Sequence, residues 1–342
     1  MENLTLDRLV KRFGNETAVD GLSLTIPEAA FVALLGPSGC GKTTILRLLA
    51  GFEKPTSGSI HLGDRRLADA RTQCPPEQRN MAMVFQSYAL WPHMSVAENV
   101  GYPLKVRGTS GNEAAGAVRA ALAQVEMERM AQRRPAELSG GQRQRVALAR
   151  CLVAKPRVVL LDEPLANLDR NLRDTMEGTF REFHRQTGAT LVYVTHDQSE
   201  AMSMADYIAV MRDGRLAQWA TPEQLYQQPV DDWVARFIGQ GAVVHIADAE
   251  PSGWLDGHVI MQAMETSLPK IRPVLLRPEH IRIGADGLSA EVRQCVYRGE
   301  RYELTLSLLD GQPLRAWHHS ALATGQSVRV RFDKGWSLQR AA

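Results

Sequence analysis

The stretch that decides the fold reads Gly36-Pro37-Ser38-Gly39-Cys40-Gly41-Lys42-Thr43-Thr44. It fits the phosphate-binding pattern G-x-x-x-x-G-K-S/T. An apolar run at residues 31–35 precedes it, and a helical pattern of apolar residues that starts at Ile45 follows it. Because a strand, a glycine-rich turn and a helix in this order are the context that the motif requires, we interpret the stretch as a phosphate-binding loop rather than a chance turn.

Each residue type in this loop has a use in binding a phosphate chain. The glycines let successive backbone N–H groups turn toward phosphate oxygens, and the start of the helix adds a partial positive charge. Lys42 is expected to reach the β- and γ-phosphates, and the Thr43 hydroxyl is expected to ligate Mg²⁺. The sequence therefore predicts a nucleotide site at residues 36–44.

Composition sets the broad class of the protein. With 342 residues the chain is long enough for two domains, and 44% hydrophobic and 23% charged residues are typical of a soluble globular protein. No apolar stretch approaches the roughly 18 residues that cross a bilayer. Residues 1–4 do not begin a basic segment followed by an apolar core, so we expect no export. The four cysteines are scattered, so a reducing cytoplasm is the simplest setting. A net charge of +2 is too small to indicate nucleic acid or a membrane surface as a partner.

The first two thirds of the chain alternate between strand-like and helix-like segments. Apolar runs predict strands at 31–35, 158–161, 191–195 and 207–211. Helical patterns between them indicate a parallel sheet covered by helices on both faces. Residues 87–156 contain two stretches with helical periodicity, 113–134 and 142–153, and we interpret them as a helical insertion between two strands of the core.

The texture changes after residue 238. Apolar and polar residues alternate over 302–308 and 328–332, which predicts a small antiparallel β domain at 241–342. A five-stranded barrel of the oligonucleotide-binding type would fit. Residues 241–342 hold 12 Lys and Arg against 11 Asp and Glu, a balance of +1. Because a barrel that binds nucleic acid should be more basic, we expect no nucleic-acid partner.

A second informative stretch, residues 158–164, is an apolar strand that ends in two carboxylates, Asp162 and Glu163. Successive side chains on a strand point in opposite directions, so the two should have different tasks. We assign Asp162 to the metal bound at Thr43, and Glu163 to the water that attacks the γ-phosphate. The alternative is a solvated acidic strand end without a function.

A third stretch reads Leu138-Ser139-Gly140-Gly141-Gln142. Ser139 and Gln142 fit a capping box at the start of a helix, so a well-capped helix is one complete explanation. The two glycines also leave N–H groups exposed at the helix start, which makes a second anion site. One monomer has no obvious reason to direct two such sites at the same triphosphate.

Residues 138–142 match the signature of ABC-transporter ATPases, and with the other two stretches they make the chain resemble the ATPase subunit of a bacterial ABC importer. The resemblance implies a catalytic and metal-sensing role for Gln86 and a γ-phosphate contact for His196. Residues 166–169 resemble the loop that crosses the dimer interface, with Asp169 at the nucleotide. Phe13 stands where the family places a ring that stacks on adenine, although a core Phe is an alternative.

The resemblance also implies an architecture and partners. The fold would be an α/β P-loop NTPase core at 1–238 with a helical subdomain at about 87–156, followed by a small all-β, OB-like regulatory domain at 241–342. Two copies would pair head to tail, each ATP and its Mg²⁺ lying between one subunit's phosphate loop and residues 139–142 of the other. Membrane permease subunits, and through them an extracytoplasmic solute-binding protein, would place the chain peripherally at the cytoplasmic face of the inner membrane.

The sequence gives less information about the transported solute. Residues 276–280 resemble a motif of the β domain in importers of maltose, sulfate, polyamines and ferric iron. After Phe237-Ile238-Gly239 the chain lacks the Pro-Met-Asn stretch of sugar systems, which favours ferric iron, with polyamine, phosphonate or sulfate as alternatives. Ala29-Ala30 stands where the family usually has a glycine, so we expect a slightly altered turn. A non-transport ABC ATPase is disfavoured, because the chain has one cassette and no sustained heptads.

Overall fold

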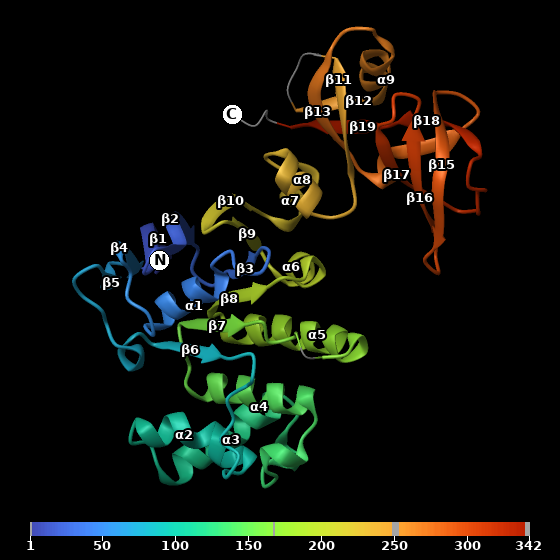
Figure 1. Ribbon diagram of the computed structural model, residues 1–342. Helices are drawn as coiled ribbons and strands as arrows, with labels where there is room; N and C mark the ends of the chain where they lie inside the picture. The colour runs from blue at the N-terminus through green and yellow to red at the C-terminus, as the bar shows by residue number, and fades with distance from the viewer. Residues whose placement is uncertain (1, 167, 248–252, 339–342) are drawn as a thin grey trace. The chain divides into compact units, whose positions relative to one another are not determined.

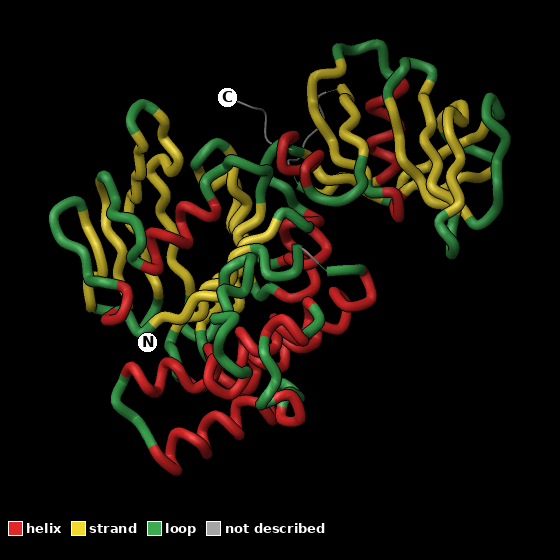
Figure 2. Tube along the Cα trace, turned by 60° about the horizontal axis from the view of Figure 1, so that its bottom comes forward, coloured by secondary structure: helices red, strands yellow, loops and turns green. Residues whose placement is uncertain are grey.

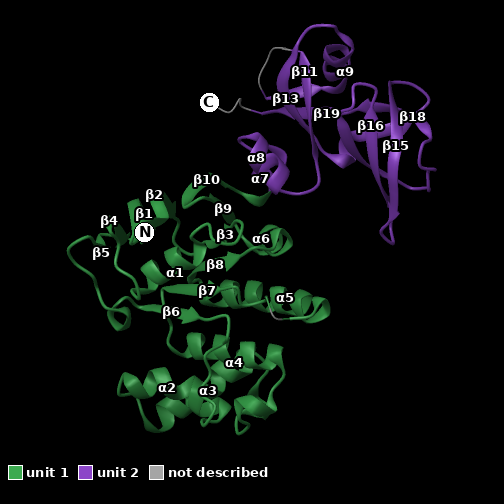
Figure 3. Ribbon diagram, viewed as in Figure 1, with its two compact units in different colours: residues 1–222 green, residues 223–342 purple. Residues whose placement is uncertain are grey.

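The computed structural model describes residues 2–166, 168–247 and 253–338. The chain forms two compact units, residues 1–222 and 223–342 (Figure 3). The units divide between Pro222 and Glu223, whereas the sequence placed a boundary at residue 238. The difference arises because α8 (Asp232–Phe237) packs against strands β11 and β13 of the second unit. In the described ranges no helix is both long enough and apolar enough to cross a membrane.

A six-stranded sheet forms the centre of the first unit, in the order β10-β9-β3-β8-β7-β6 (Figure 1). Five strands run parallel and β10 is antiparallel to β9. The strands are β3 (Phe31–Leu35), β6 (Met81–Val84), β7 (Val158–Asp162), β8 (Thr190–Thr195), β9 (Tyr207–Arg212) and β10 (Arg215–Ala220). The four strands that the sequence predicted are all present, because a strand buried on both faces is a continuous apolar run.

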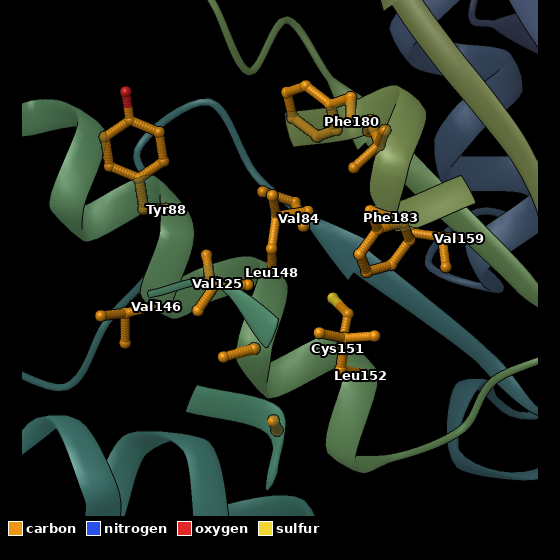
Figure 4. Packing of buried hydrophobic residues seen from close by; sticks show 14 of the residues in the cluster. Val84, Tyr88, Val125, Val146, Leu148, Cys151, Leu152, Val159, Phe180 and Phe183 are labelled. Atoms are coloured by element: carbon orange, nitrogen blue, oxygen red, sulfur yellow. The ribbon is translucent and has the colours of Figure 1, made fainter. Parts of the chain in front are cut away.

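Alternate residues of each central strand enter two different cores. On β7, Val158 and Leu160 pack in a core around α1 (Lys42–Ala50), whereas Val159 and Leu161 pack in a second core with α4 (Gly140–Val153) and α5 (Arg170–Thr187). Figure 4 shows part of this second core, where Val159 lies near Phe183 of α5. The period of two along the strand therefore fixes which helices cover which face.

A second sheet of the first unit, in the order β2-β1-β4-β5, was not predicted from the sequence. Its antiparallel strands are β1 (Leu4–Phe13), β2 (Glu16–Ile26), β4 (Ser57–Leu62) and β5 (Arg65–Asp69). Leucines of β1 and β2 share one core with α1 and the central sheet. The helix that carries Lys42 is therefore packed by apolar residues of both sheets.

A buried arginine anchors the far end of α1. Arg79 has no exposed surface, and its guanidinium donates to the carbonyls of Leu48 and Leu49 at 2.7 Å and of Cys74 at 2.8 Å. It follows a short 3-10 turn, η1 (Pro76–Gln78). Since the last carbonyls of a helix have no partner within the helix, Arg79 supplies donors that α1 lacks and ties α1 to the chain before β6.

The helical insertion holds α2 (Val96–Val106), α3 (Gly111–Gln124), α4 and two 3-10 turns, η2 (Glu128–Met130) and η3 (Pro135–Glu137). Figure 2 shows these helices grouped together as red tubes. The sequence showed helical periodicity over residues 113–134, but α3 ends at Gln124. Glu126 has a φ of 58°, which breaks the helix. Both α2 and α4 begin at a capping box.

The second unit is built of two antiparallel sheets, ordered β11-β13-β19-β12 and β14-β18-β15-β16-β17, which share one core. The strands are β11 (Ala242–Ala247), β12 (Trp254–Asp256), β13 (Lys270–Leu276), β14 (Ile281–Gly284), β15 (Leu288–Tyr297), β16 (Tyr302–Leu308), β17 (Pro313–His318), β18 (Ser327–Phe332) and β19 (Lys334–Ser337). The predicted alternation at 302–308 and 328–332 forms β16 and β18. The unit also contains α7 (Pro222–Gln227) for most of its length, α9 (Gly257–Glu265) and η4 (Pro278–His280).

Arg277 explains the motif at 276–280 structurally. Its guanidinium is buried, donates to the carbonyls of Tyr226 and Ile238, and lies 3.9 Å from the centre of the Tyr226 ring. The Tyr226 hydroxyl donates to Glu279 at 3.2 Å. Burial, with the negative charge of Glu279 added, raises the pKa of Tyr226 to about 12. The motif therefore locks residues 226–238 onto the β domain.

Candidate nucleotide and catalytic site

The phosphate loop connects β3 to α1, as the motif requires. Gly41 is the N-cap of α1 with a φ of 99°, and a Cβ there would lie 2.2 Å from the Ala18 carbonyl oxygen. A Cβ at Gly36 would lie 2.4 Å from the carbonyl oxygen of Met211. Both positions thus need glycine for space, and Gly41 also for its backbone angle. Pro37, Ser38 and Gly39 form the exposed tip of the loop, and Thr44 lies half-buried in the first turn of α1.

Lys42 is held inside the loop. Its ammonium donates to the carbonyls of Gly36 at 2.7 Å and Pro37 at 2.9 Å, and its side chain is 5% exposed. The thiol of Cys40 lies 3.8 Å from the same ammonium, and burial raises the pKa of that thiol. A positive charge is therefore fixed at the start of α1, where the backbone N–H groups also favour an anion.

The two residues predicted to hold the metal are in contact. Thr43 Oγ1 donates to Asp162 Oδ1 at 3.1 Å, across the end of β7. Burial raises the pKa of Asp162 and the adjacent charge of Glu163 adds to the effect, whereas the Thr43 hydroxyl opposes it. A hydroxyl and a carboxylate oxygen suit Mg²⁺, which usually completes its shell with phosphate oxygens and water. Within the described ranges no cluster of three or more His, Cys, Asp or Glu could hold a metal alone.

Glu163 directly follows β7 and lies close to His196. Its Oε1 lies 3.4 Å from His196 Nδ1, just beyond the end of β8. Glu163 and His196 line a cavity of about 30 Å³ together with Ala166, Arg173, Thr195, Asp197 and Glu200. That volume is enough for about one water molecule. A carboxylate and an imidazole thus line a water-sized space.

The backbone at Glu163 is strained. Its φ of 43° is in the left-handed region, where a residue with a Cβ loses about 1–2 kcal/mol. Tyr88 and Ala89, shortly after Gln86, also have positive φ, at 61° and 45°. Arg150 of α4 donates to both of their carbonyls, at 2.9 and 2.7 Å. Strain that is held in place by neighbouring contacts is typical of functional segments.

Gln86 lies at an exposed position two residues beyond β6, the strand next to β7. No described hydrogen bond joins it to Thr43 or Asp162. Its role in sensing the metal and the attacking water stays a prediction.

The capping box at the start of α4 is confirmed. Ser139 Oγ accepts from the Gln142 N–H at 3.3 Å, and Gln142 Oε1 accepts from the Ser139 N–H at 2.9 Å. Gly140 and Gly141 form the first turn of α4. Among the described contacts, Ser139 and Gln142 bond to each other rather than to the phosphate loop. A second anion site at this helix start stays a prediction.

Two other predicted residues have clear local surroundings. Phe13, at the end of β1, is 46% exposed with the Lys11 ammonium 4.6 Å from the centre of its ring, so the interpretation as a core Phe is wrong. Asp169 caps α5 by accepting from the Leu172 N–H at 3.0 Å. Asn167, in the predicted interface loop, is outside the described residues.

Sequence reasoning missed two charged residues of this site, Arg173 and Glu200. Each lies near the start of a helix, α5 and α6 (Gln198–Met204), where charged residues are common. Their presence in the wall of the Glu163–His196 cavity and their ion pair with each other distinguish them.

Comparisons with known proteins identify the family of the chain. The family model described as "ABC transporter" matches residues 19–166, and the model described as "TOBE domain" matches residues 274–337. The Fe(3+) ions import ATP-binding protein FbpC of Escherichia coli O157:H7 is 44% identical, over 96% of this chain and 92% of the relative. The spermidine/putrescine import ATP-binding protein PotA of Marinobacter nauticus is 40% identical, over 97% of this chain and 94% of the relative.

A solved structure has the same fold. The dimeric post-hydrolysis state of the ATP-binding cassette MJ0796, bound to ADP and Pi, superposes with a TM-score of 0.57 at 30% identity. The match covers 64% of this chain and 98% of that one. With relatives similar over nearly the full length, the chain belongs to the ABC-transporter ATPase family, and within it to the importer ATP-binding proteins that carry a C-terminal β domain.

Proposed function

We propose that this chain hydrolyses ATP as one half of a homodimer bound to membrane permease subunits, and so drives the import of ferric iron. The observation that carries the catalytic part is the Glu163–His196 pair, 3.4 Å apart, next to the Thr43–Asp162 pair. The choice of ferric iron rests on the FbpC relatives and on the absence of the Pro-Met-Asn stretch. A polyamine is the second candidate, because PotA relatives are nearly as similar.

The nucleotide would be bound mainly by the phosphate loop. Lys42 and the N–H groups at the start of α1 would hold the β- and γ-phosphates, and the exposed ring of Phe13 would stack on adenine. Thr43 and Asp162 would hold Mg²⁺, with Gln86 near it. When bound, Mg²⁺ neutralises charge that develops on the phosphate oxygens.

Glu163 would orient the attacking water and accept its proton. His196 has one ring nitrogen near Glu163 and a side chain that is 58% exposed, so its other nitrogen is free to donate to the γ-phosphate. Phosphoryl transfer depends mainly on positioning and electrostatic stabilisation, and a general base contributes about 10²- to 10⁴-fold. The cavity that both residues line has the size this role needs.

A head-to-tail dimer accounts for the second anion site. Each ATP would lie between the phosphate loop of one subunit and Ser139, Gly140, Gly141 and Gln142 of the other, with Asp169 close to the interface. A two-fold axis places the same pair of surfaces at both sites. The dimeric state of the MJ0796 cassette supports this arrangement. Hydrolysis would remove the bridging γ-phosphate and open the dimer.

The names of the relatives support the remaining partners. As an import ATP-binding protein, the chain would bind permease subunits at the cytoplasmic face of the inner membrane and remain peripheral. A solute-binding protein on the far side of the membrane would act on it through the permease.

Replacement of Glu163 by glutamine tests the catalytic assignment. Glu163→Gln should keep ATP binding, because Lys42, Thr43 and Asp162 remain, and should lower the hydrolysis rate by at least about 10²-fold. The variant should accumulate as an ATP-bound dimer in size-exclusion chromatography with light scattering. Glu126→Gln, a change of the same kind at an exposed residue of the insertion, is the control and should hydrolyse ATP at the normal rate. Near-normal hydrolysis by Glu163→Gln would falsify the role of Glu163.

The solute can be tested in proteoliposomes that contain the cognate permease. The solute-binding protein loaded with Fe³⁺ should stimulate ATP hydrolysis, whereas the same protein offered spermidine or putrescine should not. Stimulation by a polyamine alone would exclude ferric iron and select the second candidate.

A further inference from the structure

Arg173, in the first turn of α5, connects three segments around the catalytic cavity. Its Nη1 donates to Asp197 Oδ2 at 2.9 Å, and its Nε lies 3.6 Å from Glu200 Oε1. Its Nη2 makes a longer contact of 3.5 Å with the carbonyl of Leu168. The guanidinium therefore joins the segment that follows Glu163 to the loop that carries His196.

Glu200 is the more deeply buried of the two carboxylates that face Arg173. Its side chain is 5% exposed, and its Oε2 accepts from the Tyr193 hydroxyl at 2.7 Å and from Thr195 Oγ1 at 2.6 Å. Burial raises the pKa of Glu200, and the hydrogen bonds from Thr195 and Tyr193, with a smaller effect of the Arg173 charge, oppose that rise. A buried carboxylate that keeps its charge needs such a partner.

Asp197 is held from several directions. Its N–H donates to Thr195 Oγ1 at 2.9 Å, its Oδ1 accepts from the Ser199 N–H at 2.8 Å, and its Oδ2 accepts from Arg173. The residues on both sides of His196 are therefore fixed, Thr195 through Glu200 and Asp197 through Arg173.

His196 itself has little packing around its ring. Its side chain is 58% exposed, and its described polar contact is the one to Glu163 at 3.4 Å. The direction of the imidazole must then depend mainly on the backbone that carries it. A misplacement of about 1 Å at such a group can cost about 10²-fold in rate.

We propose that Arg173 is a positioning residue, which fixes the loop of His196 relative to Glu163 through its ion pairs with Asp197 and Glu200. The inference rests on the proposed function, since it concerns the same catalytic pair. Arg173 lines the catalytic cavity, but its Nη1 donates to Asp197, its Nε lies in ion-pair distance of Glu200, and its Nη2 contacts the Leu168 carbonyl. The competing explanation is that the ion pairs only attach α5 to α6.

Kinetics of Arg173→Met separate the two explanations. This variant keeps an unbranched apolar side chain and loses the donors. If Arg173 is a positioning residue, kcat falls by about 10-fold or more. The KM for ATP then changes by less than about 2-fold, because the phosphate loop is unchanged. Arg173→Lys restores the charge and should recover part of kcat. An unchanged kcat in Arg173→Met overturns the proposal.

Arg181→Met is the matched control. Arg181 also lies on α5 and donates to the carbonyl of Ser203 at the end of α6, away from His196. Arg181→Met should lower the unfolding temperature about as much as Arg173→Met does, and it should leave kcat unchanged. Equal losses of kcat in both variants would mean that the ion pairs of Arg173 act only by attaching α5 to α6.

A readout without hydrolysis keeps this test separate from that of the proposed function. In a protein with ¹³C-labelled histidine rings, the His196 NMR signal is assigned by its loss in His196→Gln. Arg173→Met should shift and broaden that signal, and Arg181→Met should not. If Arg173→Met fails to fold, Asp197→Asn, which keeps the helix cap, should move the same signal.

The two outcomes of this experiment do not depend on the test of Glu163. An unmoved His196 signal overturns the proposal even if Glu163→Gln behaves as expected. A moved signal supports the proposal even if Glu163→Gln still hydrolyses ATP.

Discussion

Ala29 lies in the turn before β3 with a φ of 58°, a conformation that glycine adopts without strain. Its N–H donates to Thr190 Oγ1 at 2.9 Å, which holds the turn in this conformation. Ala29→Gly should therefore raise the free energy of unfolding by about 0.5–1 kcal/mol, since relief of the strained backbone exceeds the entropy that glycine adds to the unfolded chain.

Urea denaturation measures this change. Ala115→Gly, at an exposed position in α3, is the control and should have the opposite sign, with a loss of about 0.5–1 kcal/mol. A loss of stability in Ala29→Gly would mean that the turn is not strained.

At the scale of single residues, local motifs predict local chemistry. Roles could be proposed for Thr43, Asp162 and Glu163 because each lies at or beyond the end of a strand, and the structure brings Thr43 and Asp162 into contact. No role could be proposed for Arg173 and Glu200, because their ion pair depends on how α5 packs beside α6. No spacing in the sequence encodes that contact.

At the scale of elements, the insertion contains its own control for the role of Ser139. Ser95 caps α2 with the same capping box that Ser139 makes at α4, its Oγ accepting from the Glu98 N–H at 3.2 Å. Loss of either cap should cost about 1 kcal/mol of stability. Only Ser139→Ala should also slow ATP hydrolysis, by about 10²-fold, as when one donor to a developing anion is removed.

Chemical denaturation and a phosphate-release assay on both variants measure these two effects. Normal hydrolysis by Ser139→Ala would leave the capping box as its whole function. Slow hydrolysis by both variants would instead trace the effect to helix stability.

Elements buried on both faces were the easiest to predict from the sequence. The apolar run at 31–35 is fully buried as β3. The strands of the β2-β1-β4-β5 sheet were missed, although buried and exposed residues alternate over 22–26 of β2. Along β1 the alternation is broken, because β1 pairs with β2 and β4 through register shifts. The helical period at 113–134 continued past the end of α3, since periodicity alone does not reveal the positive φ at Glu126.

At the scale of the whole molecule, each compact unit has its own hydrophobic core. We therefore expect two transitions in differential scanning calorimetry. ATP bound to Glu163→Gln should stabilise residues 1–222 by about 2.7 kcal/mol at a free ATP concentration of 100 Kd, and so raise the temperature of their transition.

Arg277→Met should lower the temperature of the transition of residues 223–342. Loss of the guanidinium leaves buried carbonyls without a donor, at a cost of about 2–3 kcal/mol. A single transition that responds to both changes would contradict independent units.

The strained backbone of Glu163 has a consequence for protein engineering. A glycine would suit its φ of 43° better than glutamate does. A screen that selects only for heat resistance should thus enrich Glu163→Gly, a variant that is more stable but does not hydrolyse ATP. Robustness and activity compete at this position, since the chemistry requires a carboxylate where the main chain prefers no side chain. Thermostabilised versions of this ATPase should be selected for growth on the transported solute as well as for heat resistance.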